Sequence, residues 1–181
     1  MMEDLSLHIL DLVENAISAG AGRIEIVVNE NERRDLLTVR VTDDGLGMTA
    51  EEVDRALDPF FTTKRKRTGL GLALLAQTAG LCGGTVAIES TPLKGTKVTA
   101  RFCHGHVDRP PLTKMAETMM MLVFGHPEID FRYRHRRNGR AFSFANRPFF
   151  DQGDGAPAWA PERIKRVRKA LREGLKRIGA S

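Results

Sequence analysis

The segment Asp43-Asp44-Gly45-Leu46-Gly47-Met48 gives the clearest indication of the fold. It follows residues 37 to 41, where apolar and polar residues alternate with the two-residue period of a β-strand. Two acidic residues at a strand end, followed by two glycines, place a carboxylate beside bare backbone that a flat ligand can approach. Asp43 can then accept a hydrogen bond from the exocyclic amine of adenine, with Gly45 and Gly47 against the purine. By itself, such a run is more often an ordinary turn.

A helix is predicted upstream, over residues 5 to 19, because apolar side chains cover most of its circumference. Its polar residues are spaced by three and four positions and so form one stripe: Asp4, His8, Asp11, Asn15 and Ser18. The amide oxygen of Asn15 is a hard ligand suited to Mg²⁺. Asp11, one turn earlier, is placed to accept a proton or to hold a metal-bound water. By itself, such a stripe is more often the solvent-facing side of a buried helix.

A basic loop leads into a second glycine-rich segment. The chain has no Walker phosphate loop, and Gly69-Leu70-Gly71-Leu72 does not fit a dinucleotide-binding fingerprint. Glycines at the start of a helix, here predicted over residues 70 to 81, still let a phosphate approach free backbone N–H groups. The cationic residues 64 to 67 would lie over the same phosphates, so we interpret this loop as a lid.

These segments resemble, in order, the N, G1, F, G2 and GT boxes of the GHKL superfamily. That superfamily includes histidine-kinase catalytic domains, anti-sigma-factor serine kinases, DNA gyrase and the mismatch-repair protein MutL. The resemblance covers about the first 102 residues and rests on Glu14-Asn15-Ala16, Asp43 to Gly47, Asp58 to Lys64, Gly69 to Leu72, Gly83-Gly84 and Gly95-Thr96. One box alone would be weak evidence, whereas five or six boxes in the family's order are unlikely to occur by chance.

The resemblance implies a Bergerat fold, which is an α/β structure (a two-layer α+β sandwich) with a mixed, mainly antiparallel sheet and helices on one face. It implies ATP and Mg²⁺ as ligands, with Asn15 as the metal ligand and Thr96 supporting the adenine. It further implies catalytic roles for Asp11, Glu14 and Lys64. The nucleotide-binding set would be Asn15, Asp43, Gly45, Gly47, Met48, Lys64, Arg67, Thr68, Gly69, Leu70, Gly71, Leu72 and Thr96.

The character of the chain changes near residue 104, so we divide it into an ATP-binding domain (1–103) and a C-terminal extension (104–181). The extension is predicted to contain a Met-rich helix over residues 113 to 124. A β-hairpin follows, with Asn138-Gly139 supplying the positive φ angles of its turn. A basic helix over residues 161 to 178 ends the chain.

Composition and charge restrict the class of protein. The 181 residues are 41% hydrophobic and 28% charged, which is ordinary for a globular protein, and the net charge is +5. Basic residues gather in the terminal helix and alternate with aromatic residues over 131 to 136. Charge alone does not distinguish nucleic acid, an anionic membrane and an acidic protein as the partner. The alternation with aromatic residues would suit RNA stacking, but a strand with one solvent-exposed face explains it more simply.

Two further expectations concern metal binding and location. Cys103, His104 and His106 lack a second ligand pair at a suitable spacing, so a structural role is preferred to a metal site. No segment is apolar over the length that a bilayer requires, and the N-terminus lacks the basic start of a signal peptide. We expect a cytoplasmic protein.

The leading functional hypothesis is a detached, histidine-kinase-like protein kinase module that phosphorylates an unidentified partner protein. It would not be a complete histidine kinase, because no phospho-accepting dimerisation helix precedes the N box, and His8 would face the nucleotide. A nucleotide-dependent binding switch of the anti-sigma-factor type, without phosphoryl transfer, is the main alternative. A MutL-like ATPase acting on nucleic acid is a third, and only the basic tail favours it. We expect no nucleic-acid partner, and the sequence leaves open whether the protein forms a homodimer.

Overall fold

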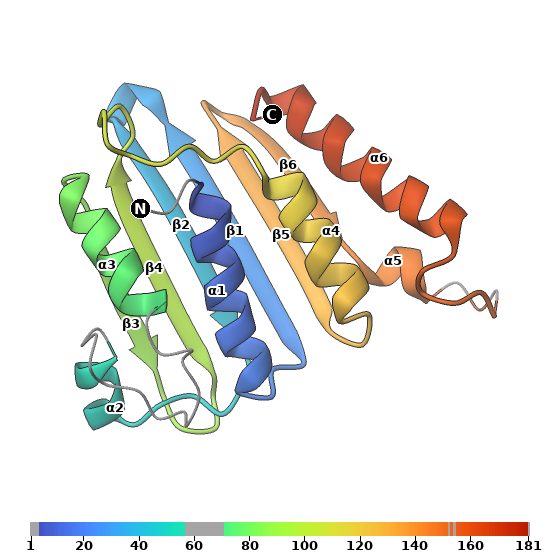
Figure 1. The fold of residues 1–181 in the computed structure, drawn as a ribbon, viewed down its shortest axis with the longest axis horizontal. Coiled ribbons are helices and arrows are strands. Elements are labelled where there is room, and N and C mark those ends of the chain that lie inside the picture. The colour runs from blue at the N-terminus through green and yellow to red at the C-terminus, as the bar shows by residue number, and fades with distance from the viewer. Residues whose placement is uncertain (1–3, 57–70, 152, 154, 181) are drawn as a thin grey trace.

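A six-stranded sheet with helices packed on one side forms the body of the molecule in the computed structural model, which describes residues 4–56, 71–151, 153 and 155–180 (Figure 1). The strands are β1 (Arg23–Asn31), β2 (Leu36–Asp43), β3 (Thr85–Ser90), β4 (Thr96–Cys103), β5 (Asp130–Arg137) and β6 (Arg140–Ala145). The helices are α1 (Leu5–Ser18), the 3₁₀ turn η1 (Glu32–Arg34), α2 (Ala50–Arg55), α3 (Gly71–Leu81), α4 (Met115–Gly125), α5 (Arg147–Phe150) and α6 (Pro161–Ile178).

The strand order is β3-β4-β2-β1-β5-β6. Every neighbouring pair is antiparallel except β1 and β5, which are parallel. The predicted mixed, mainly antiparallel sheet with helices on one face is therefore confirmed. The predicted C-terminal hairpin adds its two strands to the same sheet, beside β1.

Several local signals in the sequence correspond to the observed element ends. Thr49 and Glu52 form the expected capping box at the start of α2, with reciprocal side-chain-to-backbone hydrogen bonds. Asn138 and Gly139 have φ angles of 47° and 87°, as the β5–β6 turn requires. The short helix α5 was not expected, and it follows β6 directly.

One face of the sheet is buried beneath the helices. Figure 1 shows α3, α1, α4 and α6 arranged side by side across it, each in contact with the next. The buried sheet residues alternate along the strands and share this face: Ile24, Ile26, Val28, Leu37, Val39, Val41, Val98, Ala100, Phe102, Phe131, Tyr133, Phe142 and Phe144. In β5 the intervening arginines are exposed, so the interpretation of this strand as having one wet face is confirmed.

The segment between β4 and α4 is fixed to the start of α1 by Asp4. This buried carboxylate accepts hydrogen bonds from the backbone N–H of Ser6 (2.9 Å) and from the backbone N–H and the hydroxyl of Thr113 (3.0 and 2.8 Å). Asp4 therefore serves as the N-cap of α1 rather than as part of a polar stripe that faces a ligand.

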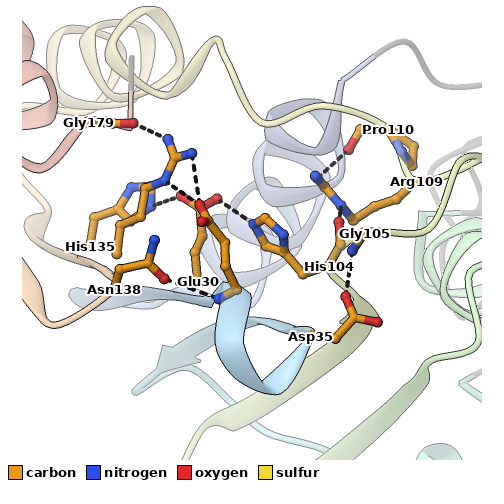
Figure 2. A network of polar contacts seen from close by, with 11 residues as sticks. Glu30, Asp35, His104, Gly105, Arg109, Pro110, His135, Asn138 and Gly179 are labelled. Atoms are coloured by element: carbon orange, nitrogen blue, oxygen red, sulfur yellow. Dashed lines mark hydrogen bonds and ion pairs between the residues drawn. The ribbon is translucent and has the colours of Figure 1, made fainter.

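A buried polar network joins β5 to β1 (Figure 2). Glu30 lies between two histidines: its Oε1 is 2.7 Å from Nε2 of His135, and its Oε2 is 3.2 Å from Nε2 of His104. The hydroxyl of Tyr133 lies 2.6 Å from the other ring nitrogen of His135. These distances fit an arrangement in which Tyr133 donates to Nδ1 of His135 and both histidines donate from Nε2 to the carboxylate. Burial raises the pKa of Glu30, but the two histidine hydrogen bonds outweigh it, so the pKa lies below its ordinary value.

Candidate functional site

Asp43 ends β2 at the edge of the helix-covered face. Its side chain is half-buried, and its Oδ1 accepts a hydrogen bond of 2.8 Å from the backbone N–H of Gly45. Burial raises the pKa of this carboxyl above its ordinary value, although N–H groups of Gly45 and Thr96 act in the opposite direction. Asp43 is thus a fixed and partly desolvated acceptor, the kind of group that recognises a donor on a buried ligand edge.

The adjacent Asp44 has a different role, which the sequence pattern did not reveal. Its Oδ1 accepts hydrogen bonds of 2.8 Å from the backbone N–H groups of both Gly22 and Arg23. Asp44 therefore anchors the start of β1 to the end of β2. Of the two consecutive carboxylates, only Asp43 remains directed toward the candidate site.

Two glycines are required because backbone segments approach closely here. A Cβ on Gly47, which has φ of +66°, would overlap the carbonyl of Thr91. A Cβ on Gly95, with φ of +87°, would overlap the carbonyl of Asp43. Both positions combine a left-handed backbone with lack of space, so a side chain is excluded on two grounds. The loop after β2 is consequently packed against the turn between β3 and β4.

Ser90 connects these two segments, and sequence reasoning missed it. The hydroxyl of Ser90 accepts a hydrogen bond of 2.8 Å from the backbone N–H of Met48 and donates one of 3.0 Å to the carbonyl of Gly95. It also lies 2.9 Å from the hydroxyl of Thr96. Met48 and Thr96, both predicted as nucleotide-binding residues, are thereby held by one side chain. No local signal distinguishes this serine from any other at the end of a strand.

A cavity of about 440 Å³ opens between α2 and the ends of β2, β3 and β4. Asp43, Thr96, Val53 and Ile88 are among its lining residues. It offers an apolar wall and a carboxylate at the same place, which is the combination that a purine requires.

The predicted residues of α1 lie beside the start of α3. A Cβ built on Gly71 would come within 3.1 Å of Cβ and 3.3 Å of Oδ2 of Asp11, so the glycine lets the two helices approach closely at this point. Burial, followed by the negative charge of Glu14, raises the pKa of Asp11. Asn15 is half-buried one turn further along, and Glu14 is exposed. The structure thus brings Asp11 and Gly71 together and keeps Asn15 on the same side of α1.

The remaining predicted positions divide into two groups. Leu72 is half-buried in α3 and packs against the hydrophobic core. The other five lie outside the described residues: Lys64, Arg67, Thr68, Gly69 and Leu70.

The expectation that His8 faces the nucleotide is wrong. His8 is only 2% exposed and is enclosed by apolar side chains, namely Leu5, Ile9, Leu12, Val39, Leu75 and Phe102. Within the described part of the chain, neither ring nitrogen has a hydrogen-bond partner. Burial lowers the pKa of the imidazole, so the ring is held in its neutral form.

This burial predicts a pH-dependent effect of the His8→Leu substitution. Because the folded pKa is below the unfolded value of about 6.5, the wild-type protein should lose unfolding free energy as the pH falls below about 6.5, by at most about 1.4 kcal/mol per pH unit. The leucine variant should be more stable by about 1 kcal/mol near neutrality, because two unpartnered buried nitrogens are removed. Urea unfolding at about pH 7 and about pH 5.5 tests this, since the gap between the two proteins should widen at the lower pH. An equal gap at both values would contradict it.

Cys103 and His104 contribute to structure in this fold. The thiol of Cys103 donates to Oδ2 of Asp35 at 2.6 Å, and the other oxygen of Asp35 accepts from the backbone N–H of Gly105 at 2.7 Å. His104 contacts Glu30, as Figure 2 shows. These contacts fasten the end of β4 to the β1–β2 turn.

Comparison with known proteins adds independent information. A model of the family described as histidine kinase-, DNA gyrase B- and HSP90-like ATPase matches residues 3–105. The sensor histidine kinase ZraS of Escherichia coli K12 is 37% identical over 95 residues, which is 52% of this chain and 20% of ZraS. The sensor histidine kinase WalK of Bacillus subtilis is 30% identical over 106 residues, covering 54% of this chain and 17% of WalK. The match thus spans about a fifth of the length of these relatives.

Solved structures support the fold over a larger part of the chain. The MutL ATPase domain of Aquifex aeolicus, complexed with ADP, superposes with a TM-score of 0.53 at 16% identity and covers 96% of this chain and 70% of that one. The N-terminal domain of a DNA repair protein gives a TM-score of 0.54 at 16% identity, covering 80% of this chain and 53% of that one. At this identity the likeness concerns the fold alone. None of the helices that the structure describes is long and apolar enough to cross a membrane.

Proposed function

Because this chain belongs to the histidine kinase-, DNA gyrase B- and HSP90-like ATPase family, we propose that it binds ATP with Mg²⁺ and transfers the terminal phosphoryl group to a partner protein. The observation that carries the proposal is Asp43. A half-buried carboxylate, fixed by the N–H of Gly45 and lining a cavity that also contains Val53 and Ile88, suits the exocyclic amine of adenine.

The phosphate end of the site would lie between α1 and the start of α3. Free N–H groups at a helix N-terminus favour an anion, and the absence of a side chain at Gly71 lets α3 begin close beside Asp11 of α1. Asn15 offers an amide oxygen and Asp11 a carboxylate on the neighbouring helix, which is the oxygen-rich donor set that Mg²⁺ prefers. The bound ion would neutralise phosphate charge, while Asn15 holds it and Asp11 orients or deprotonates an attacking group.

Transfer to a protein is supported by the kind of relatives. ZraS and WalK are sensor histidine kinases by name, and this chain matches only a part of each. In phosphoryl transfer, catalysis depends chiefly on positioning and electrostatic stabilisation, both of which a catalytic domain of this kind could provide to an acceptor protein.

The Asn15→Ala variant tests the proposal at its first step. Loss of the metal ligand should weaken Mg²⁺-dependent ATP binding by about tenfold or more, and should abolish transfer of label from γ-labelled ATP to an acceptor protein. Ser18→Ala is the matched control, because Ser18 lies one turn further along α1 and its hydroxyl donates to the carbonyl of Glu14 at 2.7 Å. Its binding should equal that of the wild type.

The outcome also separates the proposal from its main alternative. If Mg²⁺-dependent binding is tight but all of the label stays on the nucleotide, the protein is a nucleotide-dependent binding switch and not a phosphotransferase. Equal ATP binding by the Asn15→Ala and Ser18→Ala variants would show that Asn15 does not take part in nucleotide binding.

A further inference from the structure

The face of the sheet opposite the helices bears a concentration of positive charge. Four residues, here named the arginine band, lie on it: Arg40 of β2, Arg101 of β4, and Arg134 and Arg136 of β5. Arg101, Arg134 and Arg136 are exposed and Arg40 is half-buried. Figure 1 shows no helix on the far side of the sheet, so this face is uncovered in the part of the chain that is drawn as ribbon.

The strand register places the band in two adjacent rows across the sheet. In the first row, Arg101 and Arg136 lie on either side of Thr38 and Asn29, and the row ends in Thr85 and Ala141. The second row consists of Ala87, Thr99, Arg40, Val27, Arg134 and Ser143. Neither row contains an acidic residue. The four positive charges are thus concentrated on neighbouring strands with nothing of opposite sign between them.

The next row on the same face of the sheet, by contrast, contains charges of both signs. There Lys97 pairs with Glu89 at 2.6 Å, and Glu25 lies opposite Arg132 in the register. Arg132 also pairs with Asp130, one row further along the strand, at 3.1 Å. Within the described residues, no side chain of the arginine band forms an ion pair or a hydrogen bond. The nearest acidic residue on this face in the register is Glu25 of the next row. The folded protein therefore holds four guanidinium groups without an ion-pair partner close together, an arrangement that a bound polyanion would stabilise.

The dimensions of the band fit a phosphodiester backbone. Strands are separated by about 4.8 Å, and alternate residues along a strand by about 6.8 Å, so the four Cα atoms occupy an area of roughly 14 by 7 Å. A nucleic-acid duplex has one phosphate per about 3.4 Å of axis on each strand. Several phosphates of one duplex can therefore lie within reach of the four guanidinium groups at once.

The other residues of the two rows distinguish among classes of partner. They include no aromatic residue, so bases of a single strand would find nothing on which to stack. Their apolar members are the small or medium-sized Val27, Ala87 and Ala141, which do not provide the apolar centre typical of a protein–protein interface. A duplex requires neither feature, because its backbone is bound by charge alone.

We propose that the arginine band is a sequence-independent binding surface for the phosphate backbone of double-stranded nucleic acid. This revises the expectation that the protein has no nucleic-acid partner, and it rests on the sheet rather than on the basic tail. The surface is separate from the candidate nucleotide site: Asp43 projects from β2 toward the helices, whereas Arg40, three residues earlier, projects from the opposite face.

The test is fluorescence anisotropy with short labelled DNA and RNA duplexes across a salt series. Contact with about four phosphates predicts a slope of log affinity against log salt of roughly −3.6 on DNA. The double variant Arg134→Ala/Arg136→Ala should reduce the magnitude of this slope by about 2, and Arg134→Lys/Arg136→Lys should largely restore it. Arg132→Ala is the matched control on the same strand and face, and it should bind nearly as the wild type does, because Arg132 pairs with Asp130 and lies opposite Glu25 in the strand register.

Several results would overturn the proposal. One is absence of duplex binding at low salt, and another is an unchanged slope in the double alanine variant. The third is loss of binding in Lys165→Ala/Arg168→Ala, exposed residues of α6, but not in the band variants. Tighter binding of single strands or of an acidic protein than of duplexes would also contradict it. Unaltered ATP binding and unfolding midpoints in each variant show that the fold and the nucleotide site are intact.

Discussion

Replacing Asp43 by alanine is expected to weaken ATP binding by about 10- to 150-fold, because a hydrogen bond to a charged acceptor contributes about 1.5–3 kcal/mol. The carboxylate is half-buried and already accepts from the N–H of Gly45 at one oxygen, which leaves it fixed in position for a second donor. Isothermal titration calorimetry with ATP and Mg²⁺ measures the effect. Asp43→Asn, which keeps the volume and can still accept from Gly45, should lose affinity as well, because an amide is a weaker acceptor than a carboxylate.

Asp54→Ala provides the matched control for Asp43. Asp54 lines the same cavity and carries the same charge, but it is exposed at the outer side of α2. Its removal should change ATP affinity by less than about threefold, because exposed charges interact weakly through solvent. Equal losses in the Asp43 and Asp54 variants would show that general negative charge, and not adenine recognition, determines binding.

Replacing Glu30 by alanine is expected to lower the free energy of unfolding by about 2–6 kcal/mol, which is about 1–3 kcal/mol for each of the two donors that lose their acceptor. His135 is fully buried, and its Nε2–H, together with that of His104, would lose the carboxylate that accepts both. A buried donor without an acceptor retains the full cost of its desolvation. Urea unfolding followed by circular dichroism gives the loss. Since the pKa of Glu30 is lowered in the folded state, its contribution should be present above the unfolded pKa of about 4.3 and disappear as the pH falls further.

Glu32→Ala is the control for Glu30 on the same hairpin. Glu32 is exposed and pairs with Arg137 at 3.1 Å, and Arg137 keeps a second acceptor in the carbonyl of Gly179. Exposed ion pairs contribute little, so the urea midpoint should barely move. If the two variants unfold at the same urea concentration, the network of Figure 2 does not hold β5 to β1.

The parts of the fold that the sequence predicted well are those set by local chemistry. The capping box of Thr49 and Glu52, the Asn138-Gly139 turn and the bounds of α6 each depend on residues within a few positions of one another. Alternation in β5 likewise predicted which side chains are buried. In these places backbone preference and tertiary packing favour the same structure.

The parts that it did not predict depend on contacts between distant segments. Glu30 and His135 are 105 positions apart, and nothing near either residue in the sequence reveals their pairing. The same holds for Asp44, which resembles its neighbour Asp43 but bonds to backbone at the start of β1. The burial of His8 follows from the packing of α1 against α3 and against the sheet, which the three- and four-residue spacing of the polar stripe does not reveal.

Calorimetric titration of the wild-type protein with ATP, in the presence and absence of Mg²⁺, tests the central claim most directly. The account predicts saturable binding of one ATP per chain that tightens when Mg²⁺ is present, with ADP also bound. A well-folded sample that gives no heat with adenine nucleotides under either condition would contradict it.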